Sequence, residues 1–221
     1  WAFGGRWWDP ATSSFTSDHP ANVEALEWMA EHYREYASDL GIVGAGPGGF
    51  CRGTLTLSFV HAFITPDVAR LCEGNGVRWE IGPQPVMRGR GVENPLWVSG
   101  PALVVPNLPR SAEEAEAAYA FLEFATTSPE ALKFMVTVGR ALPGVVDPDI
   151  WDLVRRDEFL GPWAAMLPGV QYSRPVVPNQ RFWVTELIAA VWRVFNNEMP
   201  AREALLFHRD QVTRNLATYE P

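Results

Sequence analysis

The chain of 221 residues carries 26 acidic and 18 basic side chains, which gives a formal charge of −8. Hydrophobic residues make up 47% and charged residues 20%, which excludes a disordered tail and a charge-rich coiled coil. This negative net charge makes a nucleic-acid duplex or an anionic membrane surface an unfavourable main partner, because both are negatively charged. We therefore expect a globular chain of one large domain or two small ones.

The sequence contains no candidate for a membrane span. A spanning helix needs ~20 consecutive apolar residues, and the best run, 182–195, is interrupted by Glu186 and Arg193. The sequence opens on Trp1 with neither a basic nor an apolar leader segment. We interpret this start as a cut inside a longer, soluble protein whose export signal lies outside the sequence.

The first half of the chain is predicted to combine one helix with two strands. Residues 1–17 are rich in Gly, Ser, Thr and Trp, which is typical of a loop or a short hairpin. Apolar residues at three-and-four spacing predict a helix over 20–36, which the glycines of 41–49 end. The β-prone runs at 55–60 and 77–81 predict strands.

The second half is predicted to be mainly helical. Gly100 and Pro101 divide the β-prone run 96–106 into two extended pieces that form a crossover. Ser111 and Glu114 have the spacing of a capping box, which marks the beginning of a helix. With the apolar periodicity, these signals predict helices at 111–124, 128–139, 181–196 and 200–216.

Spacing patterns for metal or nucleophile chemistry are missing. The 4 histidines are scattered and neither cysteine has a CxxC partner, so we expect no metal and no cofactor. Ser99 lacks the first glycine of a G-x-S-x-G elbow, and Pro47 interrupts the glycine-rich run 44–49, which we interpret as a plain loop. The acidic group 147–152 leaves paired-carboxylate hydrolysis open, although Asp147 is more typical of a helix cap.

The two cysteines allow either one disulfide or two buried thiols. Cys51 and Cys72 flank the predicted strand at 55–60. A bridge between them would contribute ~3 kcal/mol in the chain-entropy model. A Cα separation above ~7 Å would exclude it.

Tryptophan is strongly enriched. The chain has 10 tryptophans, roughly three times the usual share. Flat indole faces suit the C–H faces of neutral, polyhydroxylated rings, which indicates a carbohydrate ligand. Core packing is the alternative for each single tryptophan.

A series of motifs follows the order known from one family. In chain order they are a Gly-Gly loop before a helix at 22–28, the Phe-x-x-Gly motif 50–53 before a strand, a strand ending at Pro83, the crossover 99–106, the helix pair 117–131 closed by 139–143, and a last helix from 199. This order resembles the maltose-binding-like group of extracellular solute-binding proteins, the sugar-capturing components of ATP-driven importers. Thr56-Leu57 departs from the Ala-Met that the family prefers.

The resemblance implies an α/β fold of the periplasmic-binding-protein-like, two-lobe type. Mostly the C-terminal lobe would be present, as 1–98 and 145–221, with 99–144 forming the hinge and a segment of the N-terminal lobe. Family members are nearly twice as long, so we expect the N-terminal half to lie outside this sequence. Apolar faces led by Tyr119, Leu122, Phe134 and Val138 would then lack part of their partner surface, and the chain alone would bind solute weakly.

The function implied by the resemblance is non-enzymatic. The chain would capture a sugar or oligosaccharide by lobe closure and present the closed form to the permease subunits of an ABC importer. It would act outside the membrane, in an extracellular or periplasmic position, tethered through an N-terminal segment. A helical carbohydrate-active hydrolase and a receptor for a non-sugar solute, such as a peptide or a polyamine, are the alternatives.

The resemblance also implies where the ligand is bound. The expected contacts are His61, Phe63, Trp97, Ser99, Gly100, Arg181 and Trp183. Phe63 and Trp183 would stack on sugar rings, and Ser99 and the Gly100 backbone would donate hydrogen bonds. Trp183 shares a helical face with Leu187 and Val191, so a place in the core is its alternative, and His61 has the alternative of a surface histidine.

Overall fold

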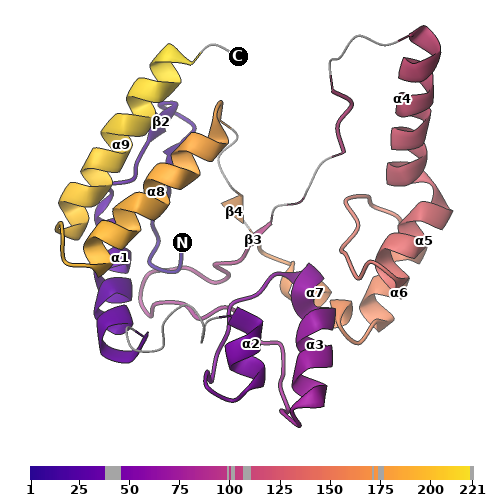
Figure 1. Cartoon of the computed structure of the whole chain (residues 1–221), viewed down its shortest axis with the longest axis horizontal. Coiled ribbons are helices and arrows are strands. Elements are labelled where there is room, and N and C mark those ends of the chain that lie inside the picture. Colours follow the sequence, from indigo (N-terminus) through magenta and orange to yellow (C-terminus); the bar gives the residue numbers. More distant parts are fainter. Residues whose placement is uncertain are drawn as a thin grey trace. The chain divides into compact units, whose positions relative to one another are not determined.

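The computed structural model describes residues 1–37, 46–98, 100, 103–106, 111–170, 172–173 and 177–219. The fold is mixed and mostly helical, with a few short strands (Figure 1). The chain divides into two compact units that alternate along the sequence. Unit 1 consists of Trp1–Gly41, Pro83–Ser99 and Gly169–Pro221, and unit 2 of Ile42–Gly82 and Gly100–Pro168.

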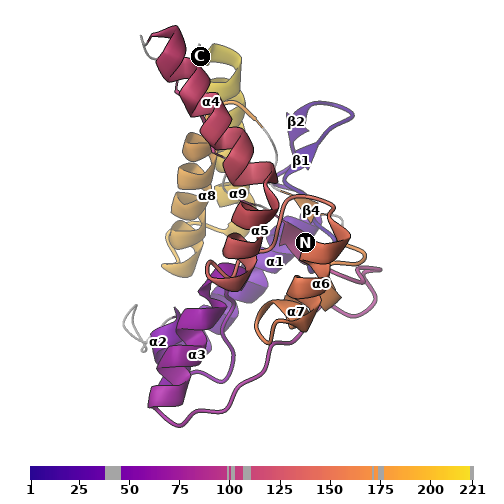
Figure 2. The same ribbon diagram turned by 90° about the vertical axis from the view of Figure 1, so that its right-hand side faces the viewer.

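Unit 1 is built on α1 (Pro20–His32), α8 (Gln180–Phe195) and α9 (Ala201–Thr218). Helices α8 and α9 lie side by side (Figures 1 and 2), joined by a short loop in which Asn197 has a φ of 58°. Small side chains allow the helices to approach closely. The buried core of this helix group consists of Leu26, Ala30, Ala190, Val194, Ala201, Ala204 and Leu205.

Two strand pairs complete unit 1: β1 (Trp8–Asp9) with β2 (Ser14–Phe15), antiparallel, and β3 (Trp97–Val98) with β4 (Tyr172–Ser173), parallel. The buried Asn22 holds the hairpin on α1, because its Nδ2 donates to the carbonyl oxygens of Arg6 and Thr16 at 2.7 and 2.9 Å. A Cβ atom on Gly5 would lie 2.0 Å from Asn22 Oδ1. Only glycine fits there.

Unit 2 contains short helices. They are α2 (Gly46–Cys51), the 3₁₀ helix η4 (Ala62–Ile64), α3 (Thr65–Gly74), α4 (Ala112–Thr127), α5 (Pro129–Thr137), α6 (Pro148–Arg156) and α7 (Leu160–Met166). Leu132 and Val136 of α5 pack with Ile150 and Val154 of α6 in the core. Trp163 Nε1 donates to Thr65 Oγ1 at 2.9 Å, which ties α7 to α3.

A disulfide between Cys51 and Cys72 joins α2 to α3. The two Cα atoms are 4.4 Å apart. Both cysteines are buried and pack with Val68 in a small apolar cluster. The alternative of two free thiols is therefore wrong.

The predicted helix starts are confirmed wherever a cap lay in the local sequence. Ser111 and Glu114 form the capping box of α4, with reciprocal bonds of 2.8 and 3.1 Å. Ser128 caps α5, since its Oγ accepts from the Ala131 N–H. Asp147 caps α6 by accepting from two backbone N–H groups.

Three local predictions are wrong. Neither 55–60 nor 77–81 forms a strand in the structure. A β-prone run becomes a strand only where a partner strand supplies hydrogen bonds, and the exposed fractions of Leu57 and Phe59, 76% and 73%, show that no sheet covers this run. Residues 46–51 form α2 instead of a loop, while 38–45 lie outside the described residues.

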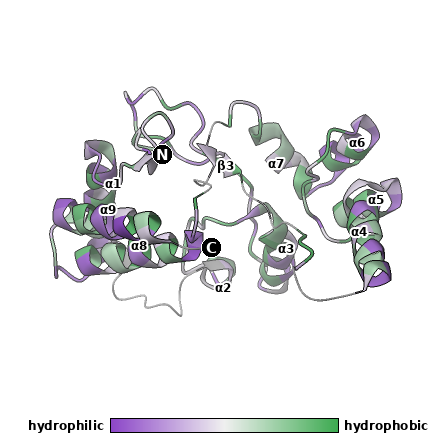
Figure 3. Cartoon of the chain, turned by 90° about the horizontal axis from the view of Figure 1, so that it is seen from above, coloured by the Kyte–Doolittle hydropathy of each residue, from purple (hydrophilic) through white to green (hydrophobic). Residues whose placement is uncertain are grey.

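Helix α4 is loosely packed in unit 2. None of its side chains is buried, and its apolar residues continue into the apolar surface of α5 (Figure 3). Of the four residues expected to lack part of their partner surface, Tyr119, Phe134 and Val138 are exposed, whereas Leu122 is half-buried. A helix with apolar residues on several faces normally packs against more than one neighbour.

The units divide the chain differently from the predicted lobes. Residues 42–82 and 145–168 join 100–144 in unit 2, because α3, α5, α6 and α7 are linked by the contacts described above. Assignment of these segments to lobes of a larger receptor stays a prediction. Among the helices of the described residues, none combines the length and apolar character needed to cross a membrane.

Removing the disulfide is expected to destabilise unit 2. The disulfide joins residues that are 21 apart in sequence and so restricts the conformations of the unfolded chain. In the variant Cys51→Ser/Cys72→Ser this restriction is removed, and the free energy of unfolding falls by ~3 kcal/mol. Urea denaturation of both proteins measures this difference. Wild-type protein with reductant should match the variant, and an unchanged midpoint in both would contradict the prediction.

Candidate ligand-binding site

Three aromatic side chains of unit 1 form what we term the aromatic shelf: Trp1, Trp97 and Tyr172. Trp97 of β3 lies opposite Tyr172 of β4 in the parallel pair. Trp1 stacks on Tyr172 with ring centroids 5.3 Å apart, and its ring is 6.3 Å from that of Trp97. All three rings are half-buried, so each keeps some accessible surface.

The local backbone fixes Trp1 in the shelf. The Gly4 N–H donates to the Trp1 carbonyl at 2.7 Å, closing a turn in which Gly4 has a φ of 81°. Glycine adopts this conformation without steric cost. The Met87 N–H donates to the Ala2 carbonyl at 3.2 Å, which ties the first residues to the segment that leads into β3.

The shelf is suited to a neutral, flat ligand. Partly exposed indole and phenol rings offer apolar faces for the C–H groups of a sugar ring, and the edge hydroxyls of such a ligand can bond to polar groups around it. None of the three side chains carries a charge at neutral pH. The arrangement can bind a ring by stacking, and it holds no nucleophile or acid–base pair.

Trp183, a predicted stacking residue, is buried. Its exposed fraction is 5%. Phe15 stacks on it at 6.2 Å, and Trp7 meets it edge-on at 6.4 Å. Its Nε1 has no hydrogen-bond partner. A ligand could reach this indole face only if Phe15 moved, so ligand stacking on Trp183 stays a prediction, as does a role for the exposed Arg181 beside it.

The other predicted contacts are divided between the units. Trp97 is part of the shelf in unit 1, whereas His61, Phe63 and Gly100 belong to unit 2. His61 and Phe63 stack on each other, with centroids 5.4 Å apart and planes within 8°. Both are exposed, as is Gly100. Ser99 lies outside the described residues.

Sequence reasoning missed Trp1 and Tyr172. The aromatic-rich opening is the signal that could have directed attention to Trp1. Tyr172 follows a proline and glycine turn at 168–169. Tyr172 is 75 positions from Trp97 in sequence, and only the pairing of β4 with β3 brings the two side chains together.

A buried histidine, His208 of α9, joins Ser17 and helix α8 within unit 1. His208 and Ser17 are both fully buried, with His208 Nδ1 2.8 Å from Ser17 Oγ. His208 Nε2 lies 3.2 Å from the Trp183 carbonyl, which can only accept, so Nε2 carries the hydrogen and Nδ1 accepts from the Ser17 hydroxyl. Burial lowers the pKa of His208, although the bond to Trp183 opposes the shift.

This Ser–His pair is structural. A substrate cannot reach a fully buried Ser17 hydroxyl, and the adjacent Asp18 is ion-paired with Arg209 at 2.6 Å. Within the described part of the chain, no group of three or more His, Cys, Asp or Glu side chains is placed to hold a metal ion. A scan against protein-family models and a search of curated proteins both found no match for this chain.

Acid is expected to destabilise unit 1 through His208. Its pKa in the folded state lies below the unfolded value, which is about 6.5, so the unfolded chain takes up the proton first as the pH falls. The neutral, buried His208 therefore makes its full contribution to the free energy of unfolding above about pH 6.5. Below that pH the contribution is lost, at no more than ~1.4 kcal/mol per pH unit.

Denaturant unfolding between pH 8 and 5, followed by tryptophan fluorescence, measures this slope. His208→Gln should be less stable at pH 8 but should lose less stability on acidification. Parallel curves for the two proteins would contradict the role of His208, because the two proteins differ only at this residue.

Proposed function

We propose that this chain captures a sugar or oligosaccharide as the substrate-binding component of an ATP-driven importer. The observation that carries the proposal is the aromatic shelf of Trp1, Trp97 and Tyr172. It presents neutral ring surfaces in a chain with ten tryptophans. Trp97 also lies close in sequence to the point where the chain leaves unit 1 for unit 2, between Ser99 and Gly100.

Capture would take place by closure of a periplasmic-binding-protein-like, two-lobe fold, to which this chain would contribute mostly the C-terminal lobe. A ligand that contacts both lobes stabilises the closed state by the difference between its affinities for the closed and open states. The closed form is the one that the membrane permease would recognise.

A position outside the cytoplasm is part of the proposal. The buried Cys51–Cys72 disulfide supports it, because such bonds form and persist in oxidising compartments. The chain would act in an extracellular or periplasmic position. Its tether to the membrane would lie in a segment outside this sequence.

The N-terminal half of the same receptor is proposed as a further partner. Leu57 and Phe59 are exposed on an extended run with high β-propensity, and α4 buries no side chain. Exposed apolar surface of this extent is typical of a surface that packs against another part of a protein. The N-terminal half would supply strands and helix contacts to unit 2.

The contacts of the carboxylates favour binding over hydrolysis. Asp147 Oδ1 already accepts from the N–H groups of Asp149 and Ile150. Asp152 is ion-paired with Arg155 at 2.6 Å. Paired-carboxylate hydrolysis needs one protonated and one free carboxyl group across a cleft, which these partners oppose.

Binding of neutral oligosaccharides tests the proposal. Isothermal titration of the chain with gluco-, xylo- and manno-oligosaccharides should give stoichiometric, weak binding of at least one. Trp97→Ala should weaken that binding about tenfold, because it removes a stacking surface. Trp192→Ala serves as the control, since it removes a partly exposed indole of α8 that is not part of the aromatic shelf.

Each contrary outcome is distinct. Continued release of product from the oligosaccharides would make the chain a hydrolase. Binding of a peptide or a polyamine without any sugar would make it a receptor for another solute. Equal losses in Trp97→Ala and Trp192→Ala, at unchanged melting temperature, would show that the aromatic shelf is not the site.

A further inference from the structure

A row of aromatic rings follows the exposed face of α1 and of the π-helix η1 (Tyr33–Ala37) that continues it. We term Trp28, His32 and Tyr36 the aromatic row. The rings of Trp28 and His32 are 3.9 Å apart, and those of His32 and Tyr36 are 5.7 Å apart. Trp28 is 44% and Tyr36 65% exposed. A contiguous group of exposed rings, unlike a single exposed ring, is typical of a surface that contacts a ligand or a partner.

A row of carboxylates runs beside the aromatic row. This acidic row consists of Glu27, Glu31 and Glu35, all exposed. Glu31 follows Trp28 by three positions, as Glu35 follows His32, and residues three apart are neighbours on a helix. The Tyr36 hydroxyl donates to the Glu35 carboxylate, and this bond, with the charges of Glu35 and Glu31, raises the pKa of Tyr36. The two rows therefore form one continuous surface.

The positive charges near this surface are engaged elsewhere. Arg34 donates from Nη1 to the Val194 carbonyl at 3.2 Å, and Arg90 pairs with Glu24. In the part of the chain that the structure describes, no ion pair involves a carboxylate of the acidic row. The surface thus presents a row of negative charge to an incoming partner.

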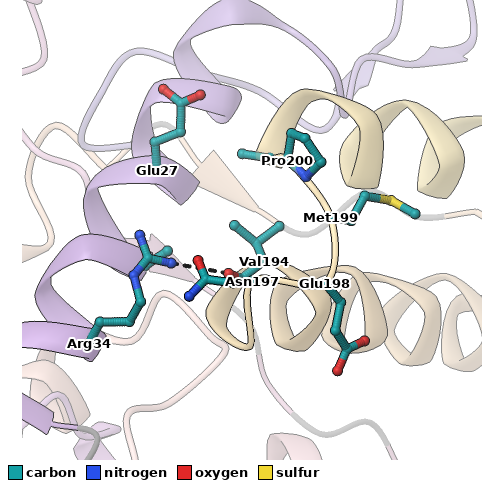
Figure 4. Close-up of a pocket in the computed structure, with 9 residues that line it drawn as sticks. Glu27, Arg34, Val194, Asn197, Glu198, Met199 and Pro200 are labelled. Atoms are coloured by element: carbon teal, nitrogen blue, oxygen red, sulfur yellow. Dashed lines mark hydrogen bonds between the residues drawn. The ribbon is translucent and has the colours of Figure 1, made fainter.

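A cavity of about 370 Å³ adjoins the acidic row. Figure 4 shows Glu27 on α1 and Arg34 on η1, with Arg34 pointing toward the loop that carries Asn197, Glu198 and Met199. Buried Ala30 and Ala201 contribute apolar lining. The lining also includes Arg34, Asn197 and Glu198, so it is mixed in polarity and carries charges of both signs.

We propose that this face of unit 1 is a docking surface for an arginine-bearing segment of a protein partner. A guanidinium group stacks on aromatic faces and pairs with carboxylates at the same time, so its chemistry matches both rows. The aromatic row supplies the faces and the acidic row the charges. This proposal is independent of solute capture on the aromatic shelf.

Lysine and free polyamines match the surface less well. An ammonium group is a compact, strongly hydrated charge and makes no planar stack. A neutral sugar could donate hydroxyl hydrogen bonds to the acidic row, but it would gain nothing from the negative charge of the row. The negative charge of the row excludes a phosphate-bearing partner.

Titration of the full chain with a hexa-arginine peptide tests the proposal. At about 50 mM salt we expect saturable binding, and this binding should weaken at about 300 mM because exposed charges are screened. Glu27→Gln/Glu31→Gln/Glu35→Gln should weaken it at least tenfold. Trp28→Ala/Tyr36→Ala should also weaken it at least tenfold, although the net charge is unchanged.

A matched variant controls for net charge. Glu113→Gln/Glu116→Gln/Glu123→Gln removes the same charge from exposed positions on α4 in unit 2, and binding should change less than twofold. Circular dichroism checks that each variant is folded.

Three results would overturn the proposal: absence of saturable binding, equal losses in the two glutamine variants, or no loss in Trp28→Ala/Tyr36→Ala. Hexa-lysine or spermine binding as tightly as hexa-arginine would also overturn it, since the site would then recognise charge alone. Oligosaccharide binding should be the same in all these variants, so failure here is distinguishable from failure of solute capture.

Discussion

The buried hydrogen bonds of His208 are the interaction on which unit 1 depends. This unit is assembled from three separate stretches of chain, and His208 connects the first stretch, through Ser17, to the last, through the Trp183 carbonyl. A buried imidazole with both nitrogens bonded has one neutral tautomer and one orientation. The aromatic shelf likewise joins separate stretches, because Trp1 belongs to the first stretch, Trp97 to the second and Tyr172 to the last.

Unit 2 is held together differently. A disulfide joins α2 to α3, the Trp163–Thr65 bond joins α3 to α7, and Arg140 pairs with Asp157 at the end of α6. These links hold short helices whose apolar cores are small. Helix α4 has little of this support, since it packs mainly against α5 and buries no side chain. The apolar character of unit 2 thus exceeds what its own contacts cover.

The sequence predicted best what is decided within a few residues. The caps Ser111, Ser128 and Asp147 bond to backbone groups two or three positions away, so local spacing was sufficient to find them. The strand predicted at 55–60 failed because strand formation depends on a distant partner, which no local pattern encodes. Tyr172 was not predicted as a site residue for the same reason. The spacing of the two cysteines was also insufficient to predict whether they form a disulfide.

Tryptophan shows why composition alone could not locate a site. The same indole ring serves as core in Trp183, which Phe15 and Trp7 cover, and as a partly open surface in Trp97, beside neutral rings. In Trp28 it stands next to a row of carboxylates on α1. Enrichment in tryptophan indicated that ring stacking matters to this chain. The neighbours of each ring decide whether it stabilises the fold, suits a neutral ligand or suits a cation, and those neighbours come from folding.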